Sequence, residues 1–316
     1  MLKWLLRVVV VVIGVVAITV GASAVMFSLW RADRVRDLEA GSEVVATALG
    51  EIEYAVVGEG VPMLVLHGTP GGYDQALVAR RAAPERYAGT MTIAVSRPGY
   101  LRTPLSSGAT FEEQADLFAA LLDELGIDRV VVYGASGGGY LGLQFALRHP
   151  DRTRGLILYG PEVDYEPLPD DWPGVDVSDA LMQDLTMWAV AGPLLGVLGP
   201  AFMPELDADD PEQAAMARGL ISSQVPFADR AAGIENDVLQ RDDPAIDEWP
   251  LERISAPTLL LHGNADENSD YEGSVLVASK IPDAELVTFE GGDHFIVITR
   301  ADEIRAHVDR FIESLQ

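Results

Sequence analysis

One serine lies among glycines in a setting that suits a nucleophile. The segment Gly134-Ala135-Ser136-Gly137-Gly138 has the G-x-S-x-G pattern, between a strand-like run at 129–134 and a helical run that ends before Pro150. A sharp strand-to-helix turn leaves room beside the serine only for residues with little or no side chain. The N–H groups and the positive dipole end of the following helix favour a developing negative charge. The pattern predicts a nucleophile elbow with Ser136 as the nucleophile.

A serine hydroxyl needs a neighbouring base, and histidine matches that task at neutral pH. The chain has five histidines. His67 and His262 each end a strand-like run in a His-Gly pair. His149 precedes Pro150, and His307 lies on the C-terminal amphipathic helix. The remaining one, His294, lies in the loop after the last strand-like run, 284–289, and is the expected general base.

Short apolar runs alternate with helical stretches and must position these residues. Continuous Val, Leu and Ile runs are typical of buried parallel strands. They occur at 63–68, 91–96, 129–134, 155–160, 258–263 and 284–289. The segments 43–49 and 51–58 indicate a hairpin, and a helix is predicted over 111–125, with Thr110 as its N-cap and Glu113 three residues on. This alternation of strands and helices along the chain predicts an α/β fold with a doubly wound, mostly parallel sheet.

From about residue 43 to 316 the chain resembles the alpha/beta-hydrolase family. Besides the serine motif, His67-Gly68-Thr69-Pro70-Gly71-Gly72 is similar to the family's HG-x-P loop. Ser96-Arg97-Pro98-Gly99-Tyr100 is similar to its RPGYG loop, with Leu101 in place of the usual glycine. The resemblance implies that the backbone N–H groups of Thr69 and Gly137 form an oxyanion hole.

The resemblance also implies an acid that orients the histidine. The run 258–263 leads into Asn264-Ala265-Asp266, which matches the family's HG-x-x-D pattern. Asp266 is expected to accept the Nδ1–H of His294, and the order Ser, Asp, His is that of this family. The proline that often follows the motif is absent, and nearby alternatives to Asp266 are Glu267, Asp270 and Glu162.

About 90 residues from Pro161 to Pro250 contain no clear strand. They predict a helical cap, 161–250, inserted into a core made of 43–160 and 251–316. An apolar stretch at 181–203 either lines an acyl or alkyl pocket or packs as the core of the cap. Its candidate pocket residues are Met182, Met187, Trp188 and Phe202. The cap is also acidic, which favours a neutral or cationic acyl substrate over an anionic one. Its acids include Asp170, Asp171, Glu205, Asp207, Asp209, Asp210 and Glu212.

The N-terminus predicts a transmembrane helix. The run from Val8 to Trp30 holds 23 residues without a charge, about 35 Å as a helix and enough to cross a bilayer. Residues 1–30 are therefore expected to anchor the chain in the cell membrane as a single span, with a linker at 31–42 and an extracytoplasmic catalytic domain. Cleavage near Ala22-Ser23-Ala24, which would give a secreted protein, is the alternative.

The composition excludes several classes. Net charge is −27, from 49 acidic and 22 basic residues, so binding to nucleic acid is not expected. The chain has no cysteine, which excludes disulfides, thiolate zinc sites and a cysteine nucleophile. The chemistry above requires no metal or organic cofactor.

These features predict a carboxylesterase-like serine hydrolase that works through an acyl-enzyme on Ser136. HGTPGG and the acidic cap also suit an aminopeptidase of the proline-iminopeptidase type, although the nucleophile motif lacks that family's usual tryptophan. Epoxide hydrolases and haloalkane dehalogenases are disfavoured, because they use an aspartate where this chain has Ser136. A non-catalytic anchored binding protein on the same fold is the alternative from another class.

Overall fold

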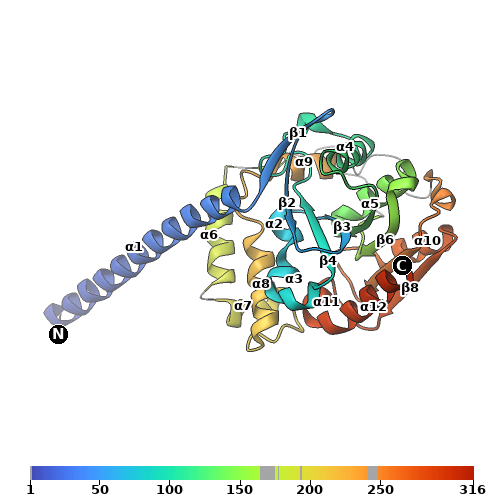
Figure 1. Cartoon of the computed structure of the whole chain (residues 1–316). Coiled ribbons are helices and arrows are strands. Elements are labelled where there is room, and N and C mark those ends of the chain that lie inside the picture. Colours follow the sequence, from blue (N-terminus) through green and yellow to red (C-terminus); the bar gives the residue numbers. More distant parts are fainter. Residues whose placement is uncertain (1, 164–174, 177, 193, 241–247) are drawn as a thin grey trace. The chain divides into compact units, whose positions relative to one another are not determined.

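The computed structural model describes residues 2–163, 175–176, 178–192, 194–240 and 248–316. The chain divides into two units, Met1–Ala40 and Gly41–Gln316. The first holds one helix and the second holds the sheet, its covering helices and the cap (Figure 1).

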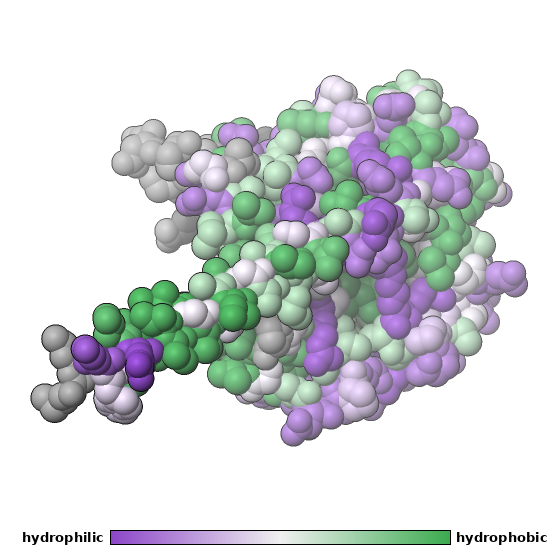
Figure 2. Space-filling model, turned by 90° about the vertical axis from the view of Figure 1, so that its left-hand side faces the viewer, coloured by the Kyte–Doolittle hydropathy of each residue, from purple (hydrophilic) through white to green (hydrophobic). Residues whose placement is uncertain are grey.

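Helix α1 covers Leu2–Ala40. Its segment Leu6–Ala40 is long and apolar enough to cross a membrane by length and composition. The face of the helix seen in Figure 2 is apolar beyond the polar residues near its start. Residues 31–40, predicted as part of a linker, are helical instead. This segment has three arginines and two alanines, which favour helix, and Asp33 pairs with Arg36 one turn away.

The second unit is built on one sheet of eight strands in the order β1-β2-β4-β3-β5-β6-β7-β8. The first two strands form the predicted antiparallel hairpin, β2 also pairs antiparallel with β4, and β3 to β8 run parallel to one another. The predicted doubly wound, mostly parallel sheet is confirmed. The strands are β1 Glu43–Thr47, β2 Gly50–Val57, β3 Val61–Leu66, β4 Thr90–Val95, β5 Val130–Ala135, β6 Thr153–Tyr159, β7 Thr258–Gly263 and β8 Ala284–Phe289.

Both faces of the sheet are covered, which explains why its strands are apolar throughout. Leu64 and Leu66 of β3 belong to one buried cluster, with residues of α4, α5 and α10. Met63 and Val65 point to the other face and pack in a cluster with α12 (Figure 1). These helices are α4 Phe111–Glu124, α5 Gly139–Arg148, α10 Tyr271–Lys280 and α12 Ala301–Ser314.

Helix α4 begins where the sequence predicts. Thr110 accepts a hydrogen bond from the backbone N–H of Glu113, and the Glu113 carboxylate accepts one from the backbone N–H of Thr110. The second unit also contains three short helices: α2 Tyr73–Ala76, α3 Val78–Ala82 and α11 Ile296–Thr299.

The described part of the segment between β6 and β7 is helical. It contains α6 Ala180–Ala191, α7 Leu195–Phe202, α8 Pro211–Ser222 and α9 Ala231–Leu239. Helices α6 to α8 share a buried cluster that includes Leu195, Met216 and, from α11, Ile298. Helix α9 lies apart from these three, near α4 (Figure 1), where the side chain of Asn236 donates to the carbonyl of Ala109 at 2.9 Å.

Candidate active site

Ser136 occupies a strained turn between β5 and α5. Its φ is 50°, in the left-handed region that residues other than glycine rarely adopt. A Cβ on Gly134 would lie 2.6 Å from the carbonyl oxygen of Gly138, so the turn is too tight for a side chain there. Strain of about 1–3 kcal/mol at one residue is typical of functional sites. The local geometry is that of a nucleophile elbow.

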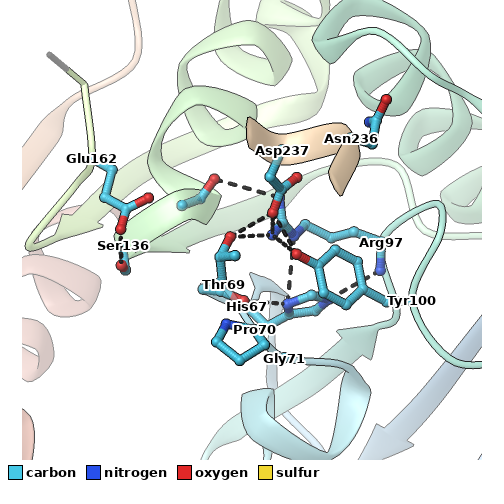
Figure 3. A network of polar contacts seen from close by, with 12 residues as sticks. His67, Thr69, Pro70, Gly71, Arg97, Tyr100, Ser136, Glu162, Asn236 and Asp237 are labelled. Carbon is cyan, nitrogen blue, oxygen red and sulfur yellow. Dashed lines mark hydrogen bonds and ion pairs between the residues drawn. The ribbon is translucent and has the colours of Figure 1, made fainter. Parts of the chain in front are cut away.

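The Ser136 hydroxyl hydrogen-bonds to a carboxylate. It donates to Oε1 of Glu162 at 3.3 Å, and Glu162 follows strand β6 (Figure 3). Within the described residues, no hydrogen bond joins Ser136 to His294. The structure thus gives Glu162, which sequence reasoning weighed as an alternative acid, a direct contact with the expected nucleophile.

His294 and Asp266 lie together. Nδ1 of His294 is 2.7 Å from Oδ2 of Asp266, whose side chain is 1% exposed. Oδ1 of Asp266 accepts from the backbone N–H groups of Asn268 and Ser269. Of the other two alternatives, Asp270 caps helix α10 and Glu267 is exposed.

A second histidine shares the Asp266 carboxylate. Nε2 of His262 lies 3.1 Å from Oδ2, and its Nδ1 lies 2.7 Å from the hydroxyl of Ser274. Burial acts to raise the pKa of Asp266, but hydrogen bonds from His262 and His294 hold that pKa well below its usual value. Asp266 is therefore a carboxylate at neutral pH. The sequence suggested only local hydrogen bonding for His262, and its spacing of four residues before Asp266 is the signal that could have revealed this contact.

The two residues expected to form an oxyanion hole lie against each other. A Cβ on Gly137 would be 2.5 Å from Oγ1 of Thr69, and a Cβ on Gly68 would be 3.0 Å from Cβ of Ser136. The loop after β3 and the elbow after β5 therefore meet beside the serine.

A polar cluster supports this loop from the cap (Figure 3). The Arg97 guanidinium, fully buried, pairs with Asp237 of α9 and donates to Oγ1 of Thr69 at 3.0 Å. The hydroxyls of Thr69 and Tyr100 also donate to Asp237. Arg97 and Tyr100 belong to the SRPGY motif, whereas no sequence pattern marks Asp237.

His67 packs beneath the same cluster. Its Nδ1 donates to the carbonyl of Gly68 at 2.7 Å, and its Nε2 accepts from the backbone N–H of Arg97 at 3.1 Å. Burial, with the positive charge of Arg97, holds the pKa of His67 well below its usual value. His67 is a neutral support for the loop and does not contact Ser136.

A buried ion pair ties a second cap residue to the loop. Arg230 and Asp74 are 3.2 Å apart, with side chains 0% and 1% exposed. Arg230 also donates to the carbonyl of Gly71. Two cap residues, Arg230 and Asp237, thus fix the conformation of the HGTPGG loop.

Ser136 and His294 line one cavity of about 470 Å³. Glu162, Thr69 and Tyr159 also line it, and the cap contributes residues of α8. The candidate cap residues Met182, Met187 and Trp188 are not among the residues that line it. Met187 packs against the cap's own cluster and Met182 is 58% exposed. The side chain of Phe202 lies outside the described residues, as do Asp170 and Asp171.

Most of the cap's acids also lie away from this cavity. Of those that the structure describes, Glu162 and Glu212 line it, and Glu212 pairs with Arg86 at 2.9 Å. Across the described ranges, no group of three or more histidine, aspartate or glutamate side chains is placed to hold a metal ion.

Comparisons with known proteins agree with this geometry. The sequence profile of the alpha/beta hydrolase family matches residues 63–307. A 2-hydroxymuconate semialdehyde hydrolase from Pseudomonas putida is 27% identical over 266 residues, which are 81% of this chain and 88% of the relative. The solved structure of an alpha/beta hydrolase fold protein from Nakamurella multipartita is 32% identical, with a TM-score of 0.68, and the match covers 84% of this chain and 97% of that one. A thermophilic esterase from Thermogutta terrifontis, 24% identical, has the same fold, with a TM-score of 0.61 and coverage of 87% and 98%. The chain therefore belongs to the alpha/beta hydrolase family.

Proposed function

We propose that this hydrolase cleaves a carboxylic ester through an acyl-enzyme formed on Ser136. The observation that carries the proposal is that Ser136, at a strained elbow, lines one cavity with His294, whose Nδ1 is held by Asp266 at 2.7 Å. This arrangement leaves Nε2 of His294 free of Asp266, as a general base requires.

The reaction follows from these roles. Nε2 of His294 takes the proton of the Ser136 hydroxyl while Oγ attacks the carbonyl carbon of the ester. The carbon–oxygen bond then breaks, and the alcohol leaves with the proton that His294 returns. Water attacks the acyl-enzyme by the same route and releases the acid. Asp266 stabilises the imidazolium of His294 that forms during acylation and again during deacylation.

The N–H groups of Thr69 and Gly137 are proposed to hold the oxyanion. Support comes from their adjacency at the elbow and from the buried contacts of the Thr69 side chain with Arg97 and Asp237. Loss of one such donor typically lowers kcat by about 10²- to 10³-fold. The fixed loop is therefore part of the catalytic apparatus.

The Ser136 hydroxyl must change partner during the cycle. It donates to Glu162 in this structure, and rotation about its χ1 is proposed to bring it to His294 when substrate enters. Apo hydrogen bonds of a nucleophile are often loose and tighten only in the complex.

A serine-directed fluorophosphonate probe tests the enzyme hypothesis. We expect wild type and Ser314→Ala, a surface serine variant, to be labelled and Ser136→Ala to remain unlabelled. Absence of labelling in wild type would favour a non-catalytic binding protein, and labelling that persists in Ser136→Ala would refute Ser136 as the nucleophile.

A substrate panel separates the enzymatic alternatives. Acyl esters are expected to be cleaved fastest. Because the Pseudomonas putida relative is a 2-hydroxymuconate semialdehyde hydrolase, that compound is the second candidate substrate, and N-terminal prolyl amides represent the aminopeptidase alternative. A higher kcat/KM for either of these than for every ester would replace the ester proposal.

Helix α1 is proposed to anchor the enzyme in the cell membrane with the catalytic unit outside. The support is the length and apolar composition of Leu6–Ala40. Protease added to intact cells should degrade the catalytic unit, and full protection would reverse the orientation. A shortened chain found in the medium would instead indicate a cleaved signal and a secreted enzyme.

A further inference from the structure

The cavity at Ser136 extends along the face of the sheet, away from the nucleophile. Met63, in the first half of β3, lines it and pairs in register with Val131 on one side and Thr92 on the other. Ser136 lies five residues beyond Val131, which corresponds to about 16 Å along a strand. The cavity therefore reaches from the nucleophile toward the amino ends of the central strands.

Small side chains on the covering helices leave this space open. Ala76, Ala79 and Ala301 line the cavity on the side of the helices, and Met63 and Val65 line it on the side of the sheet. A cavity that follows the strands between apolar side chains suits an extended chain. An extended chain advances about 1.3 Å for each bond, so about 16 Å corresponds to roughly twelve bonds. The contacts at the two ends take up about two of these, which leaves space for roughly ten carbon atoms.

The end of the cavity far from Ser136 is basic, although the protein is strongly acidic. Arg80 and Arg305 line it, and their guanidinium carbons lie over the Tyr87 ring, 5.3 Å and 4.5 Å from its centroid. Arg80 is 8% exposed. Its partners are all neutral oxygens: the hydroxyls of Thr92 and Thr90 and the carbonyls of Thr90 and Tyr87.

The charge of Arg80 has no carboxylate partner in the part of the chain that the structure describes. Arg86 pairs with Glu212, and Arg305 pairs with Asp309. Burial lowers the pKa of Arg80, and the positive charge of Arg305 acts in the same direction. A buried cation beside a second cation is stabilised when an anion binds.

A buried hydroxyl faces the same cavity. Tyr133 of β5 lines the cavity three residues before Ser136. Its hydroxyl makes no hydrogen bond to any residue among those described, and burial raises the pKa of Tyr133, so the hydroxyl remains a donor. A polar group without a partner in a cavity favours a ligand that supplies an acceptor.

We propose that the acyl part of the substrate lies extended in this cavity and carries a carboxylate at its far end, held by Arg80. The substrate class is thus a monoester of a linear dicarboxylic acid of roughly ten carbons. This assignment rests on the proposed ester hydrolysis at Ser136. Two carboxylates of the segment 161–250 also line the cavity: Glu162 lies beside Ser136, and Glu212, which acts on Tyr87, is neutralised by its pair with Arg86.

Matched esters test the inference on the full chain. The p-nitrophenyl monoester of decanedioic acid and p-nitrophenyl decanoate differ only in the terminal carboxylate. A charge-assisted hydrogen bond to a buried arginine predicts a kcat/KM about 10- to 100-fold higher for the acid-ended ester. Across monoesters of four to twelve carbons, the preference over the neutral ester should appear only when the chain approaches ten carbons.

Variants locate the effect. Arg80→Met should bring the ratio of the two kcat/KM values close to one, and Tyr133→Phe should lower it by a smaller factor. Arg154→Met, which replaces an arginine outside the cavity, should keep the ratio of wild type. Because both esters are measured on the same preparation, partial loss of folded protein does not change the ratio.

Three outcomes would overturn the inference. These are equal kcat/KM for the two esters in wild type, an unchanged ratio in Arg80→Met, and a preference that is independent of chain length. If no ester is cleaved, the ester proposal itself fails, and calorimetry of decanedioate against Ser136→Ala then tests the site separately. Binding that Arg80→Met abolishes in that background supports the site, and absence of binding refutes it.

Discussion

Asp237 of α9 pairs with the buried guanidinium of Arg97, and the contact joins the cap to the loop after β4. Nη1 of Arg97 lies 3.0 Å from Oδ1 of Asp237, and Nη2 approaches Oδ2. The side chains are 0% and 10% exposed. Thr69, whose N–H is proposed to hold the oxyanion, donates its hydroxyl to the same carboxylate. The position of the cap and the conformation of the loop that carries Thr69 are therefore coupled through the Asp237 carboxyl group.

Removal of this carboxyl group should destabilise the protein strongly. Asp237→Ala leaves the Arg97 charge buried without its partner, a change that typically costs about 3–5 kcal/mol. Urea unfolding should show that loss, whereas Glu235→Ala, at an exposed position of the same helix, should stay within about 0.5 kcal/mol of wild type. Similar midpoints of urea unfolding for the two variants would mean that the ion pair contributes little to stability.

Asp266→Asn tests the role of the acid. An amide cannot accept from His262 and His294 as the carboxylate does, so His294 loses the partner that fixes its tautomer. We expect kcat to fall by about 10⁴-fold, the loss known for the equivalent change in a serine-protease triad. Glu267→Gln, one residue further along and exposed, should retain the activity of wild type. A large loss in Glu267→Gln with little change in Asp266→Asn would reassign the acid.

The Glu162 carboxylate should lower the reactivity of the Ser136 hydroxyl. Its Oε1 accepts from the Ser136 hydroxyl, and a Cβ on Gly137 would lie 3.3 Å from its Oε2. A carboxylate there competes with His294 for the hydroxyl and repels a developing oxyanion. A hydrogen bond to a charged group is stronger than a neutral one by about 1–1.5 kcal/mol, so Glu162→Gln should increase the rate of fluorophosphonate labelling by about 5- to 12-fold. A slower rate would indicate that Glu162 positions Ser136 for attack.

The lowered pKa of His67 predicts a dependence of stability on pH. Below a pH of about 6.5 the histidine of the unfolded chain binds a proton that the buried His67 in the folded chain does not bind. Lower pH therefore favours the unfolded state, and the free energy of unfolding should fall by up to about 1.4 kcal/mol for each pH unit below that value. His67→Gln should remove this contribution. The difference in free energy of unfolding between wild type and variant should therefore become smaller from pH 7 to pH 5. Parallel pH curves would show that His67 is protonated in the folded protein.

Local patterns predicted the sheet and the residues around the elbow. The strands were visible because each is apolar along its whole length, and the start of α4 was visible because Thr110 and Glu113 satisfy each other's backbone groups. The order Ser136, Asp266, His294 followed from the places of these residues after successive strands, and the structure brings the last two into contact.

The contacts that sequence reasoning missed join residues far apart in the chain. Arg97 and Asp237 are 140 positions apart, and their contact depends on how α9 packs, which no local pattern specifies. The direction of the cavity depends on small residues of α2, α3 and α12 facing Met63 and Val65, which becomes visible only when helix and sheet are placed together. The rotamer of Ser136, and thus its bond to Glu162, is likewise a property of the folded site.

The strained backbone at Ser136 predicts a trade-off, in which glycine at this position increases stability and abolishes activity. A residue with a side chain at a φ of 50° is less stable than glycine there by about 1 kcal/mol, since the left-handed region crowds Cβ against the backbone. Ser136→Gly and Ser136→Ala both remove the nucleophile and the bond to Glu162, so they differ only in that Cβ. Both should lack fluorophosphonate labelling, and thermal or urea unfolding should show the glycine variant to be the more stable by about that amount. A glycine variant less stable than the alanine variant would show that the turn is relaxed and that the position of Ser136 carries no stored strain.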